Sequence, residues 1–343
     1  MIDPPLRLRL DGDALVSNWR WLARMSGSAA CGAAIKADGY GLGARRVFDL
    51  LIGIGCRNFF VASWSEAQAL GALPEDVALS VLHGVRAEDM AFALAAQARP
   101  TLNTSEQVAR WKAAGGGACD VMVDTGMNRL GLSVADVASG LLDGLQIETL
   151  MSHLASADEN AAQNAAQQKM FAGLRGKTNA KRMSLANSAG ICLGNDYAFD
   201  LTRPGLALYG GTPRGEAAGH ISQVAYPEAQ ILQRRRVRPG ESVGYNATFT
   251  ATQDMELAIL NLGYADGYLR GFSGKGAAGE GRFPVIGRVS MDLIAVRVDA
   301  EPALGEGDWL TLDYDLPSAA ALSGLSQYEL LTGLGNRFRR CWT

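Results

Sequence analysis

Lysine is scarce in this chain of 343 residues, which contains six lysines against 26 arginines. Basic residues are not in excess either, because the net charge is −3 and the isoelectric point is about 5.7. A protein that holds a nucleic-acid backbone usually carries a basic excess. No run of eighteen apolar residues occurs, and the first residues lack the basic and apolar regions of a signal peptide. We therefore expect a cytoplasmic protein that binds neither nucleic acid nor membrane.

Metal-binding and disulfide patterns are also missing from the sequence. The five cysteines are scattered without CxxC spacing, and the three histidines, His83, His153 and His220, are far apart in the chain. Metal centres and disulfide frameworks usually show recognisable spacings of these residues. The sequence predicts no metal site and five reduced cysteines.

One of the few lysines, Lys36, stands directly after the short apolar run of residues 31–35. Such a run, bounded by glycine, is typical of a buried strand, and the carboxyl end of a strand in a barrel or open sheet faces the ligand. Burial lowers the pKa of a lysine, which makes the neutral amine available to attack a carbonyl group. The alternative is a strand-end lysine that extends into solvent.

Short apolar runs alternate with segments of helical period from about residue 10 to residue 210. The predicted strands are residues 33–35, 59–62, 78–82, 100–102, 120–123, 147–151, 183–186 and 205–209, and predicted helices include 14–23, 44–51, 66–70 and 161–174. Eight strands separated by helices predict an α/β fold, a (β/α)8 TIM barrel. We assign residues 9–222 to this barrel and residues 223–343 to a mostly β C-terminal domain, with residues 1–8 packing on the second domain.

Polar residues follow several of the predicted barrel strands. The positions are Lys36 with Tyr40, Arg129, His153, Ser188, and Arg203 with Gly205 and Leu206. Because all strands of a barrel end at one mouth, these groups are expected to meet around one ligand. Ser188 and the N–H groups of Gly205 and Leu206 predict a phosphate cradle.

Each of these residues also has a simpler interpretation when it is considered alone. Arg129 could be a surface cation, His153 a histidine packed in the core, and Ser188 a helix N-cap. In the C-terminal half, Tyr264 lies between two glycines in residues 263–267, and Met291 lies in residues 286–292, which we interpret as a strand with a buried methionine. Tyr264 could equally be an aromatic residue that packs within its turn.

Together these segments resemble the bacterial alanine racemases, over nearly the whole chain. The matching segments are residues 34–41 (AIKADGYG), 123–131 (VDTGMNRLG), 186–189 (ANSA), 203–210 (RPGLALYG), 263–267 (GYADG) and 287–292 (GRVSMD). The resemblance implies an isomerase that depends on pyridoxal 5′-phosphate, has a TIM barrel followed by a β domain, and is a homodimer with shared active sites. It implies that the enzyme interconverts L- and D-alanine and supplies D-alanine for peptidoglycan.

The resemblance also implies the roles of single residues. Lys36 would bind the cofactor covalently and act as one base, while Tyr264 from the partner subunit would act as the second base on the opposite face. Arg129 and Met291, the latter through its backbone N–H, would bind the substrate carboxylate. The implied cofactor-binding residues are Lys36, Tyr40, His153, Ser188, Arg203, Gly205 and Leu206.

Three positions depart from the usual pattern of this family. Met122 stands where many members have a carbamylated lysine that orients the arginine matched by Arg129. Ser184 replaces a histidine that often contacts the arginine matched by Arg203. Asn336 replaces a tyrosine that often narrows the entrance, so serine or larger amino acids become alternative substrates.

Other functions remain as alternatives at this point. A serine or broad-specificity amino-acid racemase is the second hypothesis, after alanine racemase. A decarboxylase on the same barrel usually carries a glycine-rich phosphate loop and a reactive cysteine, neither of which we find. A pyridoxal-phosphate carrier without activity would resemble the barrel alone. Whether the role is biosynthetic or catabolic is left open by the sequence.

Overall fold

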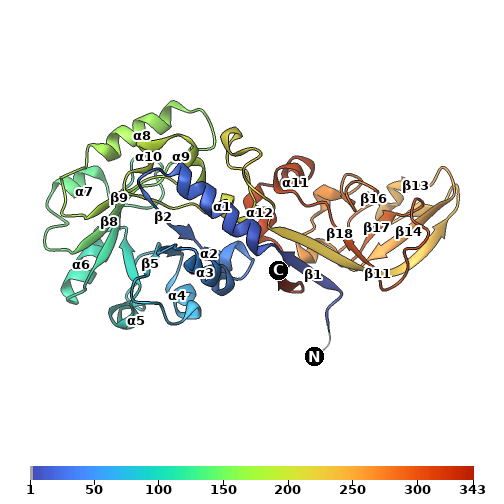
Figure 1. The fold of residues 1–343 in the computed structure, drawn as a ribbon, viewed down its shortest axis with the longest axis horizontal. Helices are drawn as coiled ribbons and strands as arrows, with labels where there is room; N and C mark the ends of the chain where they lie inside the picture. Colours follow the sequence, from blue (N-terminus) through green and yellow to red (C-terminus); the bar gives the residue numbers. More distant parts are fainter. Residues whose placement is uncertain (1–2) are drawn as a thin grey trace. The chain divides into compact units, whose positions relative to one another are not determined.

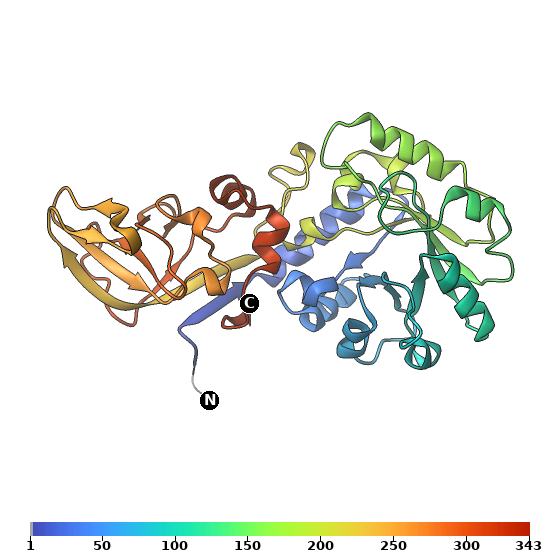
Figure 2. The ribbon, with the colours of Figure 1, turned by 180° about the vertical axis from the view of Figure 1, so that it is seen from behind.

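The structure is a computed structural model that describes residues 3–343, and it divides into two compact units (Figures 1 and 2). The barrel unit comprises Val16–Leu208 and Thr212–Ile221. The C-terminal unit comprises the N-terminal segment up to Leu15 together with Tyr209–Gly211 and Ser222–Thr343. None of the helices in residues 3–343 is long and apolar enough to span a bilayer.

Parallel strands form the centre of the barrel unit. A seven-stranded sheet has the order β3–β4–β5–β6–β7–β8–β9, with β3 at Ala33–Ala34, β4 at Asn58–Val61, β5 at Ala78–Val81, β6 at Arg99–Leu102, β7 at Cys119–Met122, β8 at Ile147–Met151 and β9 at Arg182–Ser184. These strands are buried along most of their length, as expected for parallel strands that are covered on both faces.

The eighth strand is not the one predicted. Residues 206–209 form a 3₁₀ helix, η1 (Leu206–Tyr209), and the eighth strand is instead β10 (Leu201–Thr202), which pairs in parallel with β2 (Ala30–Cys31). The apolar run at 205–209 is buried throughout, and a short buried run has no period that separates a strand from a helical turn. The barrel itself, with eight strand positions, is confirmed.

Backbone hydrogen bonds close the barrel around β10. On one side Gly32 N–H donates to Thr202 C=O at 2.9 Å and Ala34 N–H donates to Pro204 C=O at 2.8 Å. On the other side Arg203 N–H donates to Ala186 C=O at 2.8 Å. The first barrel strand, residues 30–34, therefore pairs with β10 and the residues after it on one side and with β4 on the other.

The helices of the barrel unit lie outside the strands, as Figure 1 shows. They are α1 (Gly12–Met25), which begins in the C-terminal unit, α3 (Ala44–Gly53), α4 (Trp64–Leu70), α5 (Met90–Ala95), α6 (Ser105–Ala113), α7 (Val134–Ala138), α8 (Ala162–Ala172), α9 (Ser188–Cys192) and α10 (Asn195–Ala198). Side-chain caps begin several of these helices. Ser63 and Thr104 accept hydrogen bonds from the third residue of α4 and α6, which satisfies backbone N–H groups that the helix leaves free.

The C-terminal unit is mostly β structure, as predicted. Its sheet has the order β15–β16–β17–β14–β11–β1–β19, with β18 also paired to β11. The strands are β1 (Leu6–Leu10), β11 (Ala225–Val237), β14 (Met255–Leu260), β15 (Ala277–Ala278), β16 (Phe283–Ile286), β17 (Ile294–Arg297), β18 (Trp309–Thr311) and β19 (Arg339–Trp342), with a separate pair, β12 (Ser242–Val243) and β13 (Phe249–Thr250). The helices α11 (Leu316–Ser323) and α12 (Gln327–Thr332) complete the unit, and α11 was not predicted.

Strand β1 joins this sheet from the other end of the chain. It pairs antiparallel with β11 and parallel with β19, so the beginning and the end of the described chain lie side by side. Leu6, Leu8 and Leu10 alternate with Arg7 and Arg9 and are buried in the core. The alternation places one apolar face of the strand on the core and one basic face outside it.

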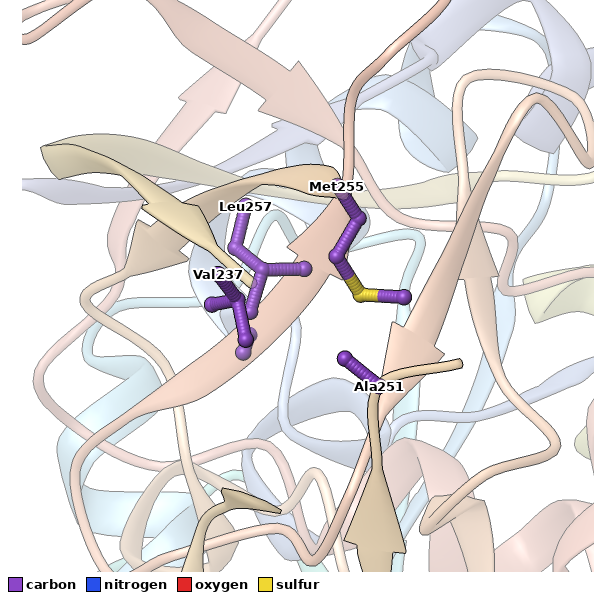
Figure 3. Packing of buried hydrophobic residues seen from close by; sticks show 5 residues of the cluster. Val237, Ala251, Met255 and Leu257 are labelled. Atoms are coloured by element: carbon purple, nitrogen blue, oxygen red, sulfur yellow. The ribbon is translucent and has the colours of Figure 1, made fainter. Parts of the chain in front are cut away.

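A separate apolar cluster lies at the β12–β13 end of the unit (Figure 3). It consists of Val237, Ala251, Met255, Leu257 and Ala295, with four partly buried neighbours, Val243, Phe249, Ile259 and Ile286, packed against it. This cluster packs the small β12–β13 pair onto the end of the main sheet.

An ion-pair cluster holds three loops of the C-terminal unit together. Arg337 donates to both carboxylate oxygens of the buried Asp266, at 2.6 Å from Nε and 2.7 Å from Nη2, and to Asp292 Oδ1 at 2.7 Å from Nη1. Asp266 Oδ2 also accepts a hydrogen bond from Gly263 N–H at 3.0 Å. The guanidinium group therefore links the turn that carries Tyr264 to the segment that carries Met291.

Replacing Arg337 by alanine is expected to destabilise this unit, because it leaves a buried carboxylate without its main partner. The expected loss is about 1–3 kcal/mol in the free energy of unfolding, measured by urea denaturation. Amide hydrogen exchange should also become faster in residues 263–267. Arg339→Ala is the matched control, because its ion pair with Asp3 is exposed and is expected to contribute less than about 1 kcal/mol. Equal losses in the two variants would contradict this assignment.

Candidate active site

Lys36 lies directly after the first barrel strand. Ile35 N–H still donates to Phe60 C=O at 2.9 Å, and Lys36 is the next residue. It therefore projects from the carboxyl end of the barrel, where the site was predicted. The side chain is partly buried rather than extended into solvent.

The backbone after Lys36 turns in the left-handed direction. Ala37, Asp38, Gly39 and Tyr40 have φ values of 52°, 52°, 63° and 56°. Three of these residues are not glycine, and each costs roughly 1–2 kcal/mol in this conformation. Hydrogen bonds offset the cost, because Gly41 N–H donates to Ala37 C=O and Ala44 N–H donates to Asp38 Oδ1, both at 2.8 Å. Such strain in non-glycine residues is common at functional sites.

The charge environment of Lys36 favours the neutral amine. Burial lowers the pKa of Lys36 below its usual value, the nearby Arg129 lowers it further, and Glu66 raises it. Arg129 and Lys36 also interact electrostatically with His153. The residues that follow β3, β7 and β8 therefore lie in one site. A neutral amine can act as a nucleophile or a base, which an ammonium group cannot.

Arg203 is buried at the end of β10. Its Nη1 donates to Ser184 Oγ and its Nη2 to Ser152 C=O, each at 2.5 Å, so Ser184 takes the contact expected of the missing histidine. Burial lowers the pKa of Arg203 to about 10, and the carboxylate of Asp120 opposes this shift. The guanidinium group still carries its charge at neutral pH.

His153, directly beyond β8, is held in the neutral form. Burial lowers the pKa of His153 to about 3, with further lowering by Arg203, Arg129 and Lys36. Burial is the main cause, and the basic groups around the ring add to it. A neutral imidazole here presents a flat ring surface without adding a further positive charge.

Ser188 lies at the beginning of α9, but it is not the helix cap. The cap is Asn187, whose side chain accepts a hydrogen bond from Gly190 N–H at 2.8 Å. The sequence pattern therefore placed the cap one residue too late. The Ser188 hydroxyl instead accepts hydrogen bonds from Gly205 N–H at 2.9 Å and from Ala207 N–H at 3.2 Å.

Gly205 permits a close approach by Tyr40. A Cβ atom at position 205 would lie 2.1 Å from the Tyr40 hydroxyl oxygen, so a side chain at this position would collide with it. The hydroxyl groups of Tyr40 and Ser188 thus meet the beginning of η1, with its Leu206 backbone. Two hydroxyl groups beside a helical turn form a group of donors suited to phosphate, and the N–H groups of Gly205 and Ala207 hold one of them, the Ser188 hydroxyl, in place.

The loop after β7 carries Arg129 and is organised by Asp124. Asp124 Oδ1 accepts hydrogen bonds from Gly126 N–H at 2.7 Å and Met127 N–H at 2.9 Å, and Oδ2 accepts one from Arg129 N–H at 2.9 Å. Although burial tends to raise the pKa of Asp124, these N–H groups lower it overall. The Arg129 guanidinium forms no hydrogen bond or ion pair with another side chain within residues 3–343, which leaves it available to an anionic ligand.

Met122, at the end of β7, lies beneath this loop. A Cβ atom on Gly131 would approach its Cγ atom at 3.2 Å, so the methionine packs against the returning end of the loop. Met122 therefore supports the loop of Arg129 by packing, whereas a carbamylated lysine would support it by charge.

Tyr264 and Met291 lie together in the C-terminal unit. Tyr264 is in a short 3₁₀ turn, η4 (Tyr264–Asp266), and its N–H donates to Ser290 C=O at 3.0 Å, while Ala265 N–H donates to Met291 C=O at 3.0 Å. The Arg270 guanidinium lies 5.2 Å from the centre of the Tyr264 ring. A cation at this distance can make a cation–π contact with the face of the ring.

The prediction of a buried methionine in a strand was wrong for residues 286–292. Strand β16 ends at Ile286, and Met291 is 53% exposed in a loop. The cause is Gly287, whose φ of 70° turns the chain out of the strand direction. Asn336 is exposed after α12.

Sequence reasoning missed several residues that hold the site in place. Glu66, Asp124, Arg270 and Arg337 contact or orient predicted site residues, although none was named in advance. A capping-box pattern at Ser63 and Glu66, in the sequence SWSE, was the available signal for one of them. The other three contacts span loops and could not be recognised from local pattern.

The neutral state of His153 leads to a test by NMR. Its pKa of about 3 in the folded protein lies below the unfolded value of about 6.5, so the unfolded state binds more protons between these pH values. The stability that His153 contributes is therefore present above about pH 6.5 and is lost as the pH falls toward about 3. The ring resonances of His153, assigned with His153→Asn, should not change between pH 8 and pH 5. A titration centred near pH 6.5 would disprove this assignment.

Comparisons with known proteins agree with this architecture. Residues 10–213 match the family model described as the alanine racemase N-terminal domain, and residues 224–342 match the alanine racemase C-terminal domain. The alanine racemase of Acidiphilium cryptum is 40% identical over 349 residues, which cover 97% of each chain. A catabolic alanine racemase of Agrobacterium fabrum is also 40% identical, over 98% of this chain and 91% of that one.

A solved structure extends the likeness to three dimensions. The crystal structure of alanine racemase from Bartonella henselae with covalently bound pyridoxal phosphate superimposes with a TM-score of 0.91 over the full length of both chains, at 32% identity. The two family models together cover nearly all of the described chain, and the order of barrel and β unit is the same. This chain belongs to the alanine racemase family.

Proposed function

We propose that this protein is an amino-acid racemase that depends on pyridoxal 5′-phosphate and interconverts L- and D-alanine. The observation that carries the proposal is the partly buried Lys36 amine of lowered pKa, in the same barrel mouth as Arg129 and His153. The alanine racemase relatives at 40% identity and the Bartonella henselae enzyme with its covalently bound cofactor support it.

The barrel mouth fits pyridoxal phosphate. The residues that would hold the phosphate are Tyr40, Ser188, Gly205 and Leu206. The absence of a side chain at Gly205 leaves room for the Tyr40 hydroxyl, and the Gly205 N–H donates to the Ser188 hydroxyl. Arg203 would face the pyridine nitrogen, and the neutral His153 would contact the ring. When bound, this cofactor acts as an electron sink for the charge that remains when a substrate carbon loses its proton.

The charged state of Arg203 bears on which reaction is favoured. Arg203 would donate a hydrogen bond to the pyridine nitrogen without transferring its proton, because the guanidinium group keeps its charge at neutral pH. A bound cofactor held in this way would be a weaker electron sink, which would favour prompt return of a proton over transamination.

Racemisation requires proton exchange on both faces of the substrate α-carbon. We assign Lys36 Nζ to one face and the Tyr264 hydroxyl of a second copy of the chain to the other, so that the enzyme acts as a homodimer with shared sites. Two fixed groups can each take or deliver a proton without exchanging places. The cation–π contact of Arg270 with the Tyr264 ring would help to hold that ring in one orientation.

Arg129 and the backbone N–H of Met291 are the proposed partners of the substrate carboxylate. Arg129 has no side-chain partner of its own within residues 3–343, and Met291 lies in the loop beside Tyr264. An arginine without an internal partner can form charge-assisted hydrogen bonds with a carboxylate.

Serine is the second candidate substrate, because Asn336 is small and exposed. The test is a measurement of kcat/KM for L-alanine and L-serine, with product detected by a D-amino-acid oxidase. We expect alanine to be preferred. A higher kcat/KM for serine would replace alanine racemase by serine racemase, and no racemisation of either amino acid would refute the proposed function.

Replacing Tyr264 by phenylalanine should affect the two directions of the reaction unequally. The variant keeps the ring and its contact with Arg270 but loses the proton carrier of one face. Proton abstraction from one enantiomer should slow by about 10²–10⁴-fold, and far more than abstraction from the other, when measured by exchange of the α-hydrogen with deuterated water. Equal losses for both enantiomers would contradict the assignment of faces.

The cellular role and the domain limits are also proposals. We propose a cytoplasmic enzyme that supplies D-alanine for peptidoglycan. We further propose residues 9–222 as the cofactor-binding domain and residues 223–343 as the domain that contributes Tyr264.

A further inference from the structure

The carboxylate of Glu66 is shared between two segments of the barrel. Its Oε2 accepts hydrogen bonds from Ala62 N–H at 2.6 Å and Ser63 N–H at 3.4 Å, which forms the capping box at the beginning of α4. Its Oε1 accepts a hydrogen bond from Ala37 N–H at 2.8 Å. Glu66 therefore joins the beginning of a helix to the residue that follows Lys36.

Capping alone does not require a negative charge at this position. Two strands further along the barrel, Gln107 occupies the same place at the beginning of α6. Its Oε1 accepts a hydrogen bond from Asn103 N–H at 2.9 Å, and its own N–H donates to Thr104 Oγ1 at 3.2 Å. A neutral amide thus suffices for the cap, so the charge of Glu66 is available for another role.

The contact that Glu66 adds is with the left-handed turn. Ala37 is the first residue of that turn, with φ of 52° and ψ of 48°. The hydrogen bond from its N–H to Glu66 fixes the backbone at the point where the Lys36 side chain leaves it. The direction of the Lys36 side chain therefore depends on Glu66.

We propose that Glu66 is a positioning residue for Lys36: its carboxylate fixes the N–H of Ala37, and its negative charge offsets the positive charge of Arg129 near the Lys36 amine. This inference rests on the proposed role of Lys36. It concerns a residue outside the cofactor, substrate and proton-transfer groups assigned above.

The titratable and charged groups around Lys36 come from several elements. Arg129 faces it from the loop after β7, His153 from the end of β8, and Glu66 from α4. Asp38 belongs to the same turn, but its Oδ1 is engaged by Ala44 N–H at the beginning of α3. Of the charges that act on the pKa of Lys36, Arg129 lowers it and Glu66 raises it.

This balance matters for an amine that must both take and release a proton. Such a group works best when its pKa lies near the working pH. Burial and Arg129 alone would leave the amine less able to hold a proton. The carboxylate of Glu66 restores part of that ability without touching the substrate.

The test is Glu66→Gln, which keeps the shape of the cap and removes the charge. The pKa of Lys36 is measured on the full-length, cofactor-free chain by competitive labelling with acetic anhydride over a pH series, followed by peptide mass spectrometry. In Glu66→Gln, the labelling midpoint of Lys36 should move to lower pH, and its labelling at neutral pH should become about two- to tenfold faster.

Asp136→Asn is the matched control. Asp136 forms the same capping box with Ser133 at the beginning of α7, through hydrogen bonds of 2.9 and 3.0 Å, and does not contact the turn of Lys36. The labelling midpoint of Lys36 should not move in this control. Glu66→Asp keeps the charge, so its midpoint should stay near that of the unmodified protein.

The outcomes separate a charge effect from a merely structural one. If Glu66 only supported the fold, its loss would open the turn to water and move the midpoint of Lys36 to higher pH. An unchanged or higher midpoint in Glu66→Gln would therefore overturn the proposal. If Glu66→Gln did not fold, a lower midpoint in Glu66→Asp would overturn it instead.

The failure of this inference can be distinguished from failure of the proposed function. Labelling reports on the Lys36 amine without cofactor, substrate or turnover. A racemase whose Lys36 midpoint is unaffected by Glu66→Gln would retain the proposed function and refute the role of Glu66. A protein with the expected midpoint shift but no racemase activity would support the role of Glu66 and refute the proposed function.

Discussion

The burial of basic groups close to one another in the barrel mouth is the constraint on which the rest of the site depends. Lys36, Arg129, His153 and Arg203 come from the ends of different strands and act on one another electrostatically. Burial lowers the pKa of both the Lys36 amine and the His153 imidazole, and the neighbouring positive charges lower them further. Opposite charge is supplied by Glu66, which acts on Lys36, and by Asp120, which acts on Arg203. Such a site favours anionic ligands, and a phosphate or a carboxylate would complete its charge balance.

The left-handed turn converts this charge arrangement into a defined geometry. It reverses the chain within five residues, so that Lys36 and Tyr40 both reach the mouth, and Tyr40 meets Gly205, which follows the neighbouring strand β10. The strain in Ala37, Asp38 and Tyr40 is tolerated because neighbouring elements supply hydrogen bonds to the same turn. In the C-terminal unit, the Arg337 cluster serves a comparable purpose for Tyr264, because it fixes a short turn through a buried carboxylate.

Much of this arrangement could be predicted from sequence. Lys36 could be located because an apolar run ends at a glycine-rich segment, and seven of the eight predicted strands overlap those in the structure. The prediction of the eighth strand was wrong because residues 205–209 form a short run without polar residues. Such a run has no hydrophobic period that distinguishes a strand from a 3₁₀ helix. Met291 was wrongly predicted to lie buried in a strand, because the chain turns at Gly287. Ser188 was wrongly predicted as the cap of α9, because the neighbouring Asn187 takes that position. The contact of Glu66 with Ala37 and the contacts of Arg337 with Asp266 and Asp292 join segments distant in sequence, and no local pattern encodes them.

The central claim is that Lys36, among six lysines, is the one that this site has made reactive. The most direct test is to reduce the purified, yellow, cofactor-loaded protein with borohydride and to map the modified peptide by mass spectrometry. The account predicts a single pyridoxyl group on Lys36 and loss of the visible absorbance band. A pyridoxyl group on any other lysine, or a protein that remains colourless in the presence of pyridoxal phosphate, would contradict it.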